Sequence, residues 1–324
     1  MRTNRRRLLK ADVVIVLPIV AAALFAAPRP EVATFLTERQ SQTTADAEYD
    51  KAAALGAEGR LDEARAVFES AAHLDPKNSD IAAAVEMFRD LDAGRVSKEA
   101  VQRLFRGMQY TKDEKWTEAE VELGEALKLS PRYARAHDVL AQLHAYQGHY
   151  DRSIELLNRA VTLDPQFAQG FFDRGATYAE MNQPTRAIAD YNRAIALRPT
   201  FMEAYRNRGS AYANMRKFDA AVADYTRAHE LDPRTVEPLF LRGVVHAAME
   251  DWDAAITDFS MTIERDPSYA VPYYNRGLMH QNKGNHKQAV ADYEAFLKHV
   301  QVEDDPEVAP LVKSARERLA ALKK

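Results

Sequence analysis

A spacing of 34 residues recurs through most of the chain. Prolines stand at four consecutive intervals of 34, and an Arg-Gly pair repeats at the same interval. The prolines are Pro131, Pro165, Pro199, Pro233 and Pro267, and the pairs begin at Arg174, Arg208, Arg242 and Arg276. A long, regular period of this kind is typical of repeat architectures, in which each unit buries its apolar face against its neighbours.

Each period contains two apolar patterns of helical spacing, separated by a short polar turn. In residues 202–235 the first pattern is carried by Tyr205, Gly209 and Tyr212, and the second by Ala221, Tyr225 and Ala228. The proline then ends the second helix, because it cannot continue the hydrogen-bond ladder. The sequence therefore predicts an all-α fold of antiparallel helix pairs.

This pattern resembles the tetratricopeptide repeat (TPR) superfamily, whose unit is an antiparallel helix pair with small residues where the helices cross. Six units lie over residues 100–303 (100–133, 134–167, 168–201, 202–235, 236–269 and 270–303), and a more diverged unit covers 45–78. The small crossing residues are Gly107, Ala141, Gly175, Gly209, Gly243 and Gly277. The resemblance implies an α-solenoid, a right-handed superhelix of about seven units.

Both ends of the array depart from the period. Residues 79–99 lie between the first two units, and their apolar spacing predicts one extra helix that ends near Gly94. Residues 304–324 form a predicted amphipathic helix, which we expect to cap the open apolar end of the stack.

The first 27 residues predict a signal peptide or an N-terminal membrane anchor. Five basic residues in the first ten precede an uncharged, mostly aliphatic stretch from Val13 to Ala27. That stretch is long for a signal-peptide core and short for a membrane-spanning helix, so both alternatives stay open. Residues 28–44 are a polar linker. We expect the repeats to lie in a bacterial periplasm, either membrane-anchored through residues 13–27 or released after cleavage.

Charge and composition limit the classes of partner. The net charge is −4, and without the basic first ten residues the rest of the chain carries −9. An acidic body argues against nucleic acid, because phosphate binding requires clustered Lys and Arg. The absence of cysteine excludes disulfides and thiolate chemistry.

The repeated arginines predict ion pairs between antiparallel helices, either within a unit or across to its neighbour. An acidic residue stands sixteen residues after the arginine in five units, as Arg106–Glu122, Arg174–Asp190, Arg208–Asp224, Arg242–Asp258 and Arg276–Asp292. The unit at 134 has Leu140 and Leu156 in the same two places. Because both places change together, we interpret the charged residues as structural pairs rather than as a row of anion-binding arginines.

No catalytic or cofactor motif accompanies the repeats. His144, His246 and His280 share one place in their units, but side chains a whole repeat apart are too distant to bind one metal ion. Hydrolase, phosphate-loop and dinucleotide fingerprints are absent from the sequence. We therefore expect no enzymatic activity, no cofactor and no metal.

The resemblance implies a concave groove lined by the first helices of successive units. The family's groove-facing places map onto Asp138, Phe172, Arg206, Phe240 and Tyr274, then onto Gln142, Ser210, Val244 and Leu278, and finally onto Tyr146 and Asn214. Aromatic residues beside an arginine would suit a peptide with apolar anchors and an acidic group. The alternative is that the aromatic residues pack between units.

The resulting functional hypothesis is a non-catalytic scaffold that binds a partner peptide or helix in this groove. Two alternatives remain: a self-assembling component that forms homo-oligomers, and a regulatory subunit of a separate enzyme.

Overall fold

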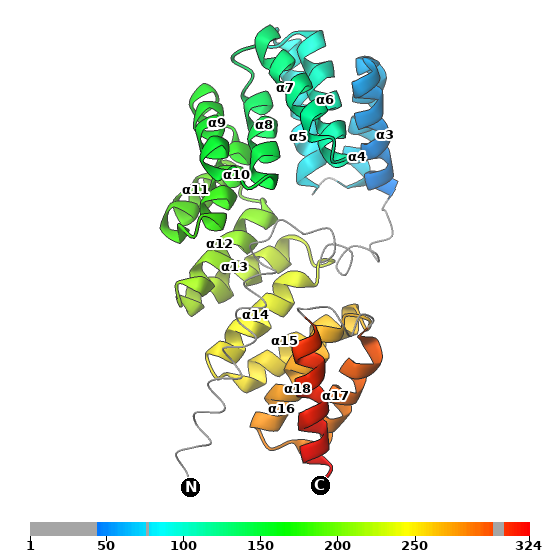
Figure 1. The fold of residues 1–324 in the computed structure, drawn as a ribbon, viewed down its shortest axis with the longest axis vertical. Coiled ribbons are helices and arrows are strands. Elements are labelled where there is room, and N and C mark those ends of the chain that lie inside the picture. Colours follow the sequence, from blue (N-terminus) through cyan, green and yellow to red (C-terminus); the bar gives the residue numbers. More distant parts are fainter. Residues whose placement is uncertain (1–43, 76–77, 301–307) are drawn as a thin grey trace. The chain divides into compact units, whose positions relative to one another are not determined.

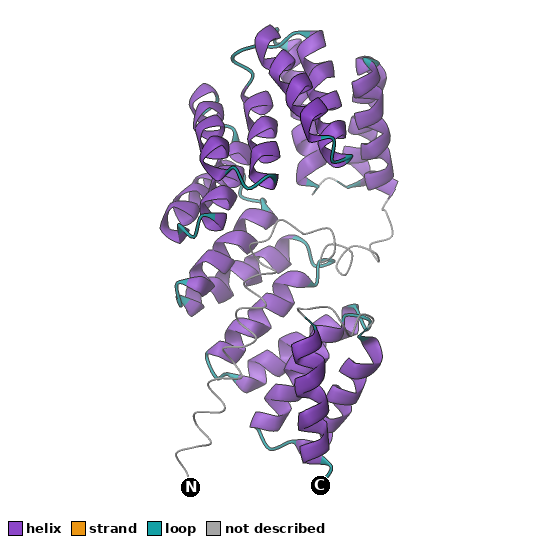
Figure 2. Cartoon of the chain, in the orientation of Figure 1, coloured by secondary structure: helices purple, strands orange, loops and turns teal. Residues whose placement is uncertain are grey.

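The computed structural model describes residues 44–75, 78–300 and 308–324, and these residues form helices without any strand (Figures 1 and 2). The helices are α3 (Thr44–Glu58), α4 (Leu61–Leu74), α5 (Ser79–Asp92), α6 (Lys98–Lys112), α7 (Trp116–Leu129), α8 (Ala134–Tyr146), α9 (Tyr150–Leu163), α10 (Ala168–Glu180), α11 (Pro184–Leu197), α12 (Met202–Asn214), α13 (Phe218–Leu231), α14 (Glu237–Ala248), α15 (Trp252–Arg265), α16 (Ala270–Asn282), α17 (His286–His299) and α18 (Ala309–Leu322). The all-α prediction is confirmed.

The predicted N-terminal anchor or signal and almost all of the linker lie outside the described residues. Within the described ranges, the apolar stretches are too short for any helix to cross a membrane.

The described residues divide into two compact parts, an N-terminal part (44–204) and a C-terminal part (205–324), and α12 spans the division. In each part, short turns join consecutive helices into antiparallel pairs (Figure 1). The second helix of a pair then packs against the first helix of the next pair, as α9 does on α10 and α15 does on α16. This repeated stacking is the α-solenoid arrangement.

Close approach of two helices explains the glycine that recurs in most of the first helices. A Cβ added at Gly243 would lie 2.8 Å from the ring of Phe259, and one at Gly175 would lie 2.8 Å from the ring of Tyr191. Both rings belong to the second helix of the same repeat and are buried. The glycine therefore makes room for a large core side chain, which offsets its poor helix propensity.

The first helix pair stacks differently from the others. In the regular repeats a second helix packs on the next first helix, but here α3, the first helix of its pair, packs along α6. Phe105 of α6 lies against Gly56 of α3 and stacks on Phe68 of α4. The extra helix α5 packs on α4 and brings Phe88 to the same aromatic cluster. The insertion thus changes which helix of the first pair meets the array.

The last helix, α18, covers the end of the C-terminal part. Its buried residues Leu311, Val312 and Ala315 share one apolar cluster with Tyr293 and Phe296 of α17. The apolar surface that α17 would otherwise expose is thereby removed from water.

Candidate partner-binding surface

The residues predicted to line a groove stand at the fifth, ninth and thirteenth places of each repeat, counted from the first residue of that repeat. In the N-terminal part these places fall on α8 and α10. In the C-terminal part they fall on α12, α14 and α16. We call the side of the first helices that carries these three places the first-helix face. Four-residue spacing puts the three places on one side of a helix.

The aromatic residues at the fifth place are core residues rather than surface anchors. Phe240 is 4% exposed and lies 5.8 Å from the ring of Phe259 and 5.2 Å from that of Tyr269. Tyr274 is 4% exposed, and its hydroxyl donates to Ser314 of α18 at 3.0 Å. The prediction that these two side chains are available to a partner is therefore wrong, because rings at this place fill the space between a first helix and its neighbours.

Phe172, the third aromatic residue, is half-buried and makes the same kind of contact. Its ring lies 5.8 Å from that of Tyr191 and 4.8 Å from that of Phe201, which are both buried. Interhelical packing accounts for these contacts, as it does for Phe240 and Tyr274.

Three residues at the ninth place are buried as well. Val244 and Leu278 belong to one apolar cluster of the C-terminal part. The Ser210 hydroxyl lies 3.0 Å from the hydroxyl of the buried Tyr225 and donates to the carbonyl oxygen of Arg206. The prediction that these side chains line a groove is therefore wrong. They are core residues, because the adjacent helices cover them.

The accessible part of the predicted set is small. Tyr146 at the end of α8 is 58% exposed, and Asn214 at the end of α12 is also exposed. Gln142 and Arg206 are half-buried. Accessibility thus rises toward the thirteenth place, where the helices end and fewer neighbours cover them.

Arg206, which we predicted to bind an acidic group of a partner, instead forms an ion pair with a residue of this chain. Its Nη1 donates to Glu237 of α14 at 2.5 Å, and its Nε donates to the Asn207 side chain at 3.2 Å. An acidic partner group would have to compete with Glu237 for the guanidinium. The sequence could not show this pairing, because the two residues lie in different repeats.

A polar group joins α8 and α10 on the first-helix face of the N-terminal part. Gln142 Nε2 donates to Asp173 Oδ2 at 3.0 Å and lies 3.4 Å from Asp138 Oδ2. Gln169 Nε2 donates to both carboxylate oxygens of Asp173, at 3.2 and 3.3 Å. We call Asp138, Gln142, Gln169 and Asp173 the α8–α10 polar group. The repeat pattern predicts Asp138 and Gln142 as surface residues but not Gln169 and Asp173, because only the stacking of α8 on α10 brings the two helical faces together.

Burial changes the protonation chemistry of this face. Asp138 is 3% exposed, and its burial, together with the nearby charge of Asp173, raises the pKa of its carboxyl group well above the ordinary value. Partial burial also raises the pKa of Glu180, at the end of α10, to about 7. The first-helix face of the N-terminal part is therefore acidic but not fully ionised at neutral pH.

The arginine and aspartate of each regular charged repeat are in contact. The pairs are Arg174–Asp190, Arg208–Asp224, Arg242–Asp258 and Arg276–Asp292, with shortest N–O distances of 2.6, 2.6, 2.6 and 2.7 Å. All four aspartates are buried. Hydrogen bonding to Asp258 raises the pKa of the Arg242 guanidinium above its ordinary value. In the uncharged repeat, Leu140 and Leu156 are both buried in one apolar cluster.

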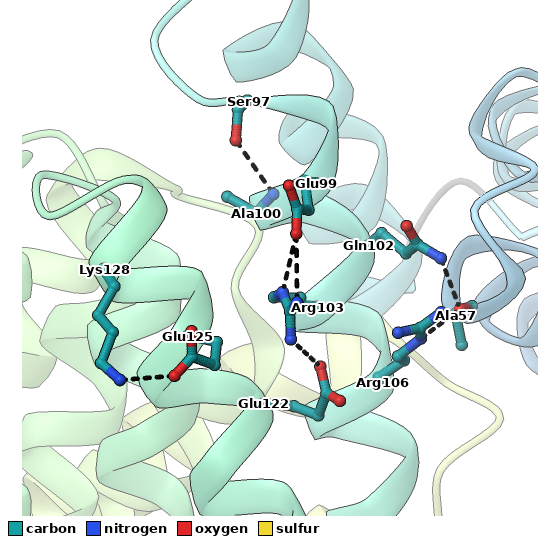
Figure 3. Close-up of polar contacts among 10 residues, drawn as sticks. All are labelled: Ala57, Ser97, Glu99, Ala100, Gln102, Arg103, Arg106, Glu122, Glu125 and Lys128. Atoms are coloured by element: carbon teal, nitrogen blue, oxygen red, sulfur yellow. Dashed lines mark hydrogen bonds and ion pairs between the residues drawn. The ribbon is translucent and has the colours of Figure 1, made fainter.

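Arg106 does not form the predicted pair with Glu122 (Figure 3). Its Nε donates to the carbonyl oxygen of Ala57 at 2.9 Å, and Glu122 instead accepts from Arg103 at 3.2 Å. The correction follows from the unusual stacking of α3 along α6, which places the last turn of α3 beside Arg106. Carbonyl groups in a last helical turn have no intrahelical partner and favour a cation.

The histidine row does not come together. His246 Nε2 lies 3.8 Å from Asp258 and His280 Nε2 lies 4.0 Å from Asp292, each within its own repeat. Among the described residues, no group of three or more His, Cys, Asp or Glu side chains is arranged to hold a metal ion.

Comparison with known proteins connects this architecture to one family. Tetratricopeptide repeat models match residues 134–167, 203–234 and 270–298, and a TPR repeat model matches residues 177–215. No curated protein sequence matches the chain.

Three solved structures with the same fold are compared with this chain. One is PilW, described as a widely conserved type IV pilus biogenesis factor, with 18% identity over 67% of this chain and 100% of that chain and a TM-score of 0.60. Another is Pseudomonas aeruginosa pilF, with 16% identity over 68% of this chain and 99% of that chain and a TM-score of 0.58. A third is YrrB, described as a TPR protein with an unusual peptide-binding site, with 20% identity over 59% and 97% of the two chains and a TM-score of 0.50.

At these identities the likeness shows the fold alone. The repeat matches, the 34-residue period and the stacked helix pairs agree with one another. The chain is therefore a tetratricopeptide-repeat protein over the residues that these models match.

Proposed function

We propose that the chain is a non-catalytic scaffold that binds a segment of a partner protein on the first-helix face of its N-terminal part, around Tyr146. The TPR fold itself supports a role in protein interaction. The observation that carries the proposal is the contrast along α8: Asp138 is buried, Gln142 is half-buried, and Tyr146 is exposed on the same side of the helix. Tyrosine is enriched among the residues that contribute most to the stability of protein interfaces.

The chemistry of this surface indicates the kind of partner. Gln142, Gln169 and Asp173 offer amides and a carboxylate that can hydrogen-bond to a peptide backbone or to a polar side chain. Glu180 adds a carboxyl group that becomes negative above a pH of about 7. A partner segment with an apolar side chain for Tyr146 and with hydrogen-bond donors would fit this surface better than the acidic peptide that the sequence suggested.

Site-specific photo-crosslinking tests this proposal in cells. A photoreactive phenylalanine at position 146 should give a discrete crosslinked product, and mass spectrometry would identify the partner. The matched control is the same substitution at Val121, which is also 58% exposed but lies on the second helix α7 of another repeat. Equal products from both positions, or none from position 146, would contradict the proposal.

The same experiment separates the alternative functions. A product that contains two copies of this chain would favour a self-assembling component, and a product with an enzyme would favour a regulatory subunit. Residues 1–27, outside the described ranges, support our further proposal that the scaffold works in a bacterial envelope, anchored or released. Cell fractionation tests it: deletion of residues 2–27 should move the chain from the envelope to the cytoplasm.

A further inference from the structure

Asp138 is a buried carboxyl group with few hydrogen-bond donors around it. It is 3% exposed, and Gln142 Nε2, at 3.4 Å, is the donor that reaches its Oδ2. Its Oδ1 is buried and has no hydrogen-bond partner among the described residues. A buried carboxylate normally accepts several hydrogen bonds or contacts a cation, because removing its charge from water is costly.

A second carboxyl group lies at the same place. Gln142 Nε2 is within 3.4 Å of one oxygen of Asp138 and one oxygen of Asp173, so these two oxygens converge on a single nitrogen. Asp173 also accepts two hydrogen bonds from Gln169, which favour its ionised form. Two adjacent carboxyl groups do not both ionise readily, and the one with fewer donors and deeper burial retains the proton.

The nearest cation on the same helix is already engaged elsewhere. Arg135, in the first turn of α8, donates to Glu86 at 2.7 Å and to Asp90 at 3.3 Å, and both acids belong to α5. Its charge favours ionisation of Asp138, but burial and Asp173 act more strongly in the opposite direction. The charged groups that face Asp138 are therefore Asp173 from α10 and Arg135 from α8, and Arg135 is shared with two carboxylates of α5.

We propose that Asp138 keeps its proton at neutral pH and that this proton, shared with Asp173, holds α8 against α10, so that the contact weakens as the pH rises. The protonated carboxyl group adds a donor to the α8–α10 polar group, in which the amides of Gln142 and Gln169 already donate to Asp173. Loss of the proton leaves two neighbouring negative charges on one first-helix face. This pH response belongs to the fold of the N-terminal part and does not depend on which partner binds there.

The sign of the pH effect follows from proton linkage. A carboxyl group whose pKa is higher in the folded state binds more protons there than in the open state, so stability falls as the pH rises from the ordinary pKa to the folded one. Hydrogen exchange of the backbone amides of α8 and α10, corrected for the intrinsic exchange rate, measures the opening equilibrium. Between pH 5 and 7 the opening constant of the natural chain, divided by that of Asp138→Asn, should rise about tenfold per pH unit. The ratio is used because His137, His144 and Glu180, on the same two helices, also have shifted pKa values.

Two variants and one control identify the group responsible. Asp138→Asn has the shape of the protonated acid and should remove the part of the pH dependence that Asp138 causes. Asp173→Asn removes the neighbouring negative charge. This should lower the pKa of Asp138 and shift its part of the pH dependence to lower pH. Asp151→Asn changes an exposed carboxyl group in the first turn of α9 and should leave the dependence unchanged.

Infrared difference spectra give a second readout. At pH 7 a Glu180→Gln chain should show the C=O stretch of a protonated carboxylic acid, and this band should disappear on titration to high pH. Glu180 is replaced because its carboxyl group, with a pKa of about 7, would contribute to the same band. A ratio of opening constants that is independent of pH between 5 and 7, or the absence of the protonated band at pH 7, would overturn the proposal.

Discussion

Arg242 donates two hydrogen bonds to Asp258 in its own repeat and a third to Thr226 in the second helix of the preceding repeat. The same third bond joins Arg276 to Ser260 and Arg174 to Asn158. Each of these arginines therefore holds its own helix pair together and also connects it to the preceding pair. A guanidinium can do this because its five N–H donors point in fixed, divergent directions.

Loss of this arginine should destabilise the C-terminal part. Arg242→Ala leaves Asp258 buried without its guanidinium partner, which should lower the free energy of unfolding by about 3 kcal/mol. In urea unfolding of the single variants and the double variant, Arg242→Ala and Asp258→Ala should be strongly non-additive. Additive losses would show that the two side chains do not depend on each other. The exposed pair Arg152–Glu155 on α9 is the control and should show far weaker coupling.

The glycine at the helix crossing should not tolerate a methyl group. Gly243→Ala brings a Cβ to 2.8 Å from Phe259, so we expect a loss of about 1–3 kcal/mol in the free energy of unfolding. Gly124, in α7, has no atom within 4 Å of an added Cβ. There the better helix propensity of alanine should instead add about 0.5–1 kcal/mol. Equal effects at both positions, measured by urea unfolding, would rule out the packing explanation.

Phe240 should behave as a core residue and not as a binding anchor. Phe240→Ala removes a buried ring that contacts Phe259 and Tyr269, and should cost about 3–5 kcal/mol of stability. Phe240→Leu keeps most of the volume and should retain most of the stability. If Phe240→Ala left the thermal unfolding midpoint unchanged but reduced crosslinking to a partner, the groove interpretation would be restored.

His280 should make stability decrease in mild acid. Burial lowers the pKa of His280 below its ordinary value, so the unfolded chain binds its proton first as the pH falls. Stability should therefore decline from about pH 6.5 down to the folded pKa of this residue. His280→Tyr, which copies Tyr178 and Tyr212 at the same place of other repeats, should reduce that decline. Unfolding midpoints at pH 5 and pH 8 measure the difference, and an unchanged difference would contradict the assignment.

The repeat period was sufficient to predict the helix pairs and most internal ion pairs. Each pair joins residues sixteen apart in one antiparallel hairpin, so their meeting depends only on local geometry that every repeat shares. Arg106 does not follow this rule, because its partner lies in α3. The packing of α3 along α6 accompanies the extra helix α5, which is not part of the repeat period.

The binding surface was harder to predict because exposure depends on neighbours. Phe172, Phe240 and Tyr274 occupy the face that the family pattern assigns to a groove, yet large rings at that place gain more by filling interhelical space than by facing water. Arg206 looked available until its pairing with Glu237 of the following repeat was known. Asp173 was overlooked because its partners, Gln142 and Asp138, lie 31 and 35 residues away in the chain.

The sequence by itself determined the period, the helical hairpins, the crossing glycines and the within-repeat Arg–Asp pairs, since these depend on spacing along one hairpin. Only the tertiary structure decided which first-helix side chains are covered, how the first helix pair stacks, and that Asp138 lies buried beside Asp173. Those features depend on contacts between repeats, where burial and charge come from residues that the local sequence pattern does not specify.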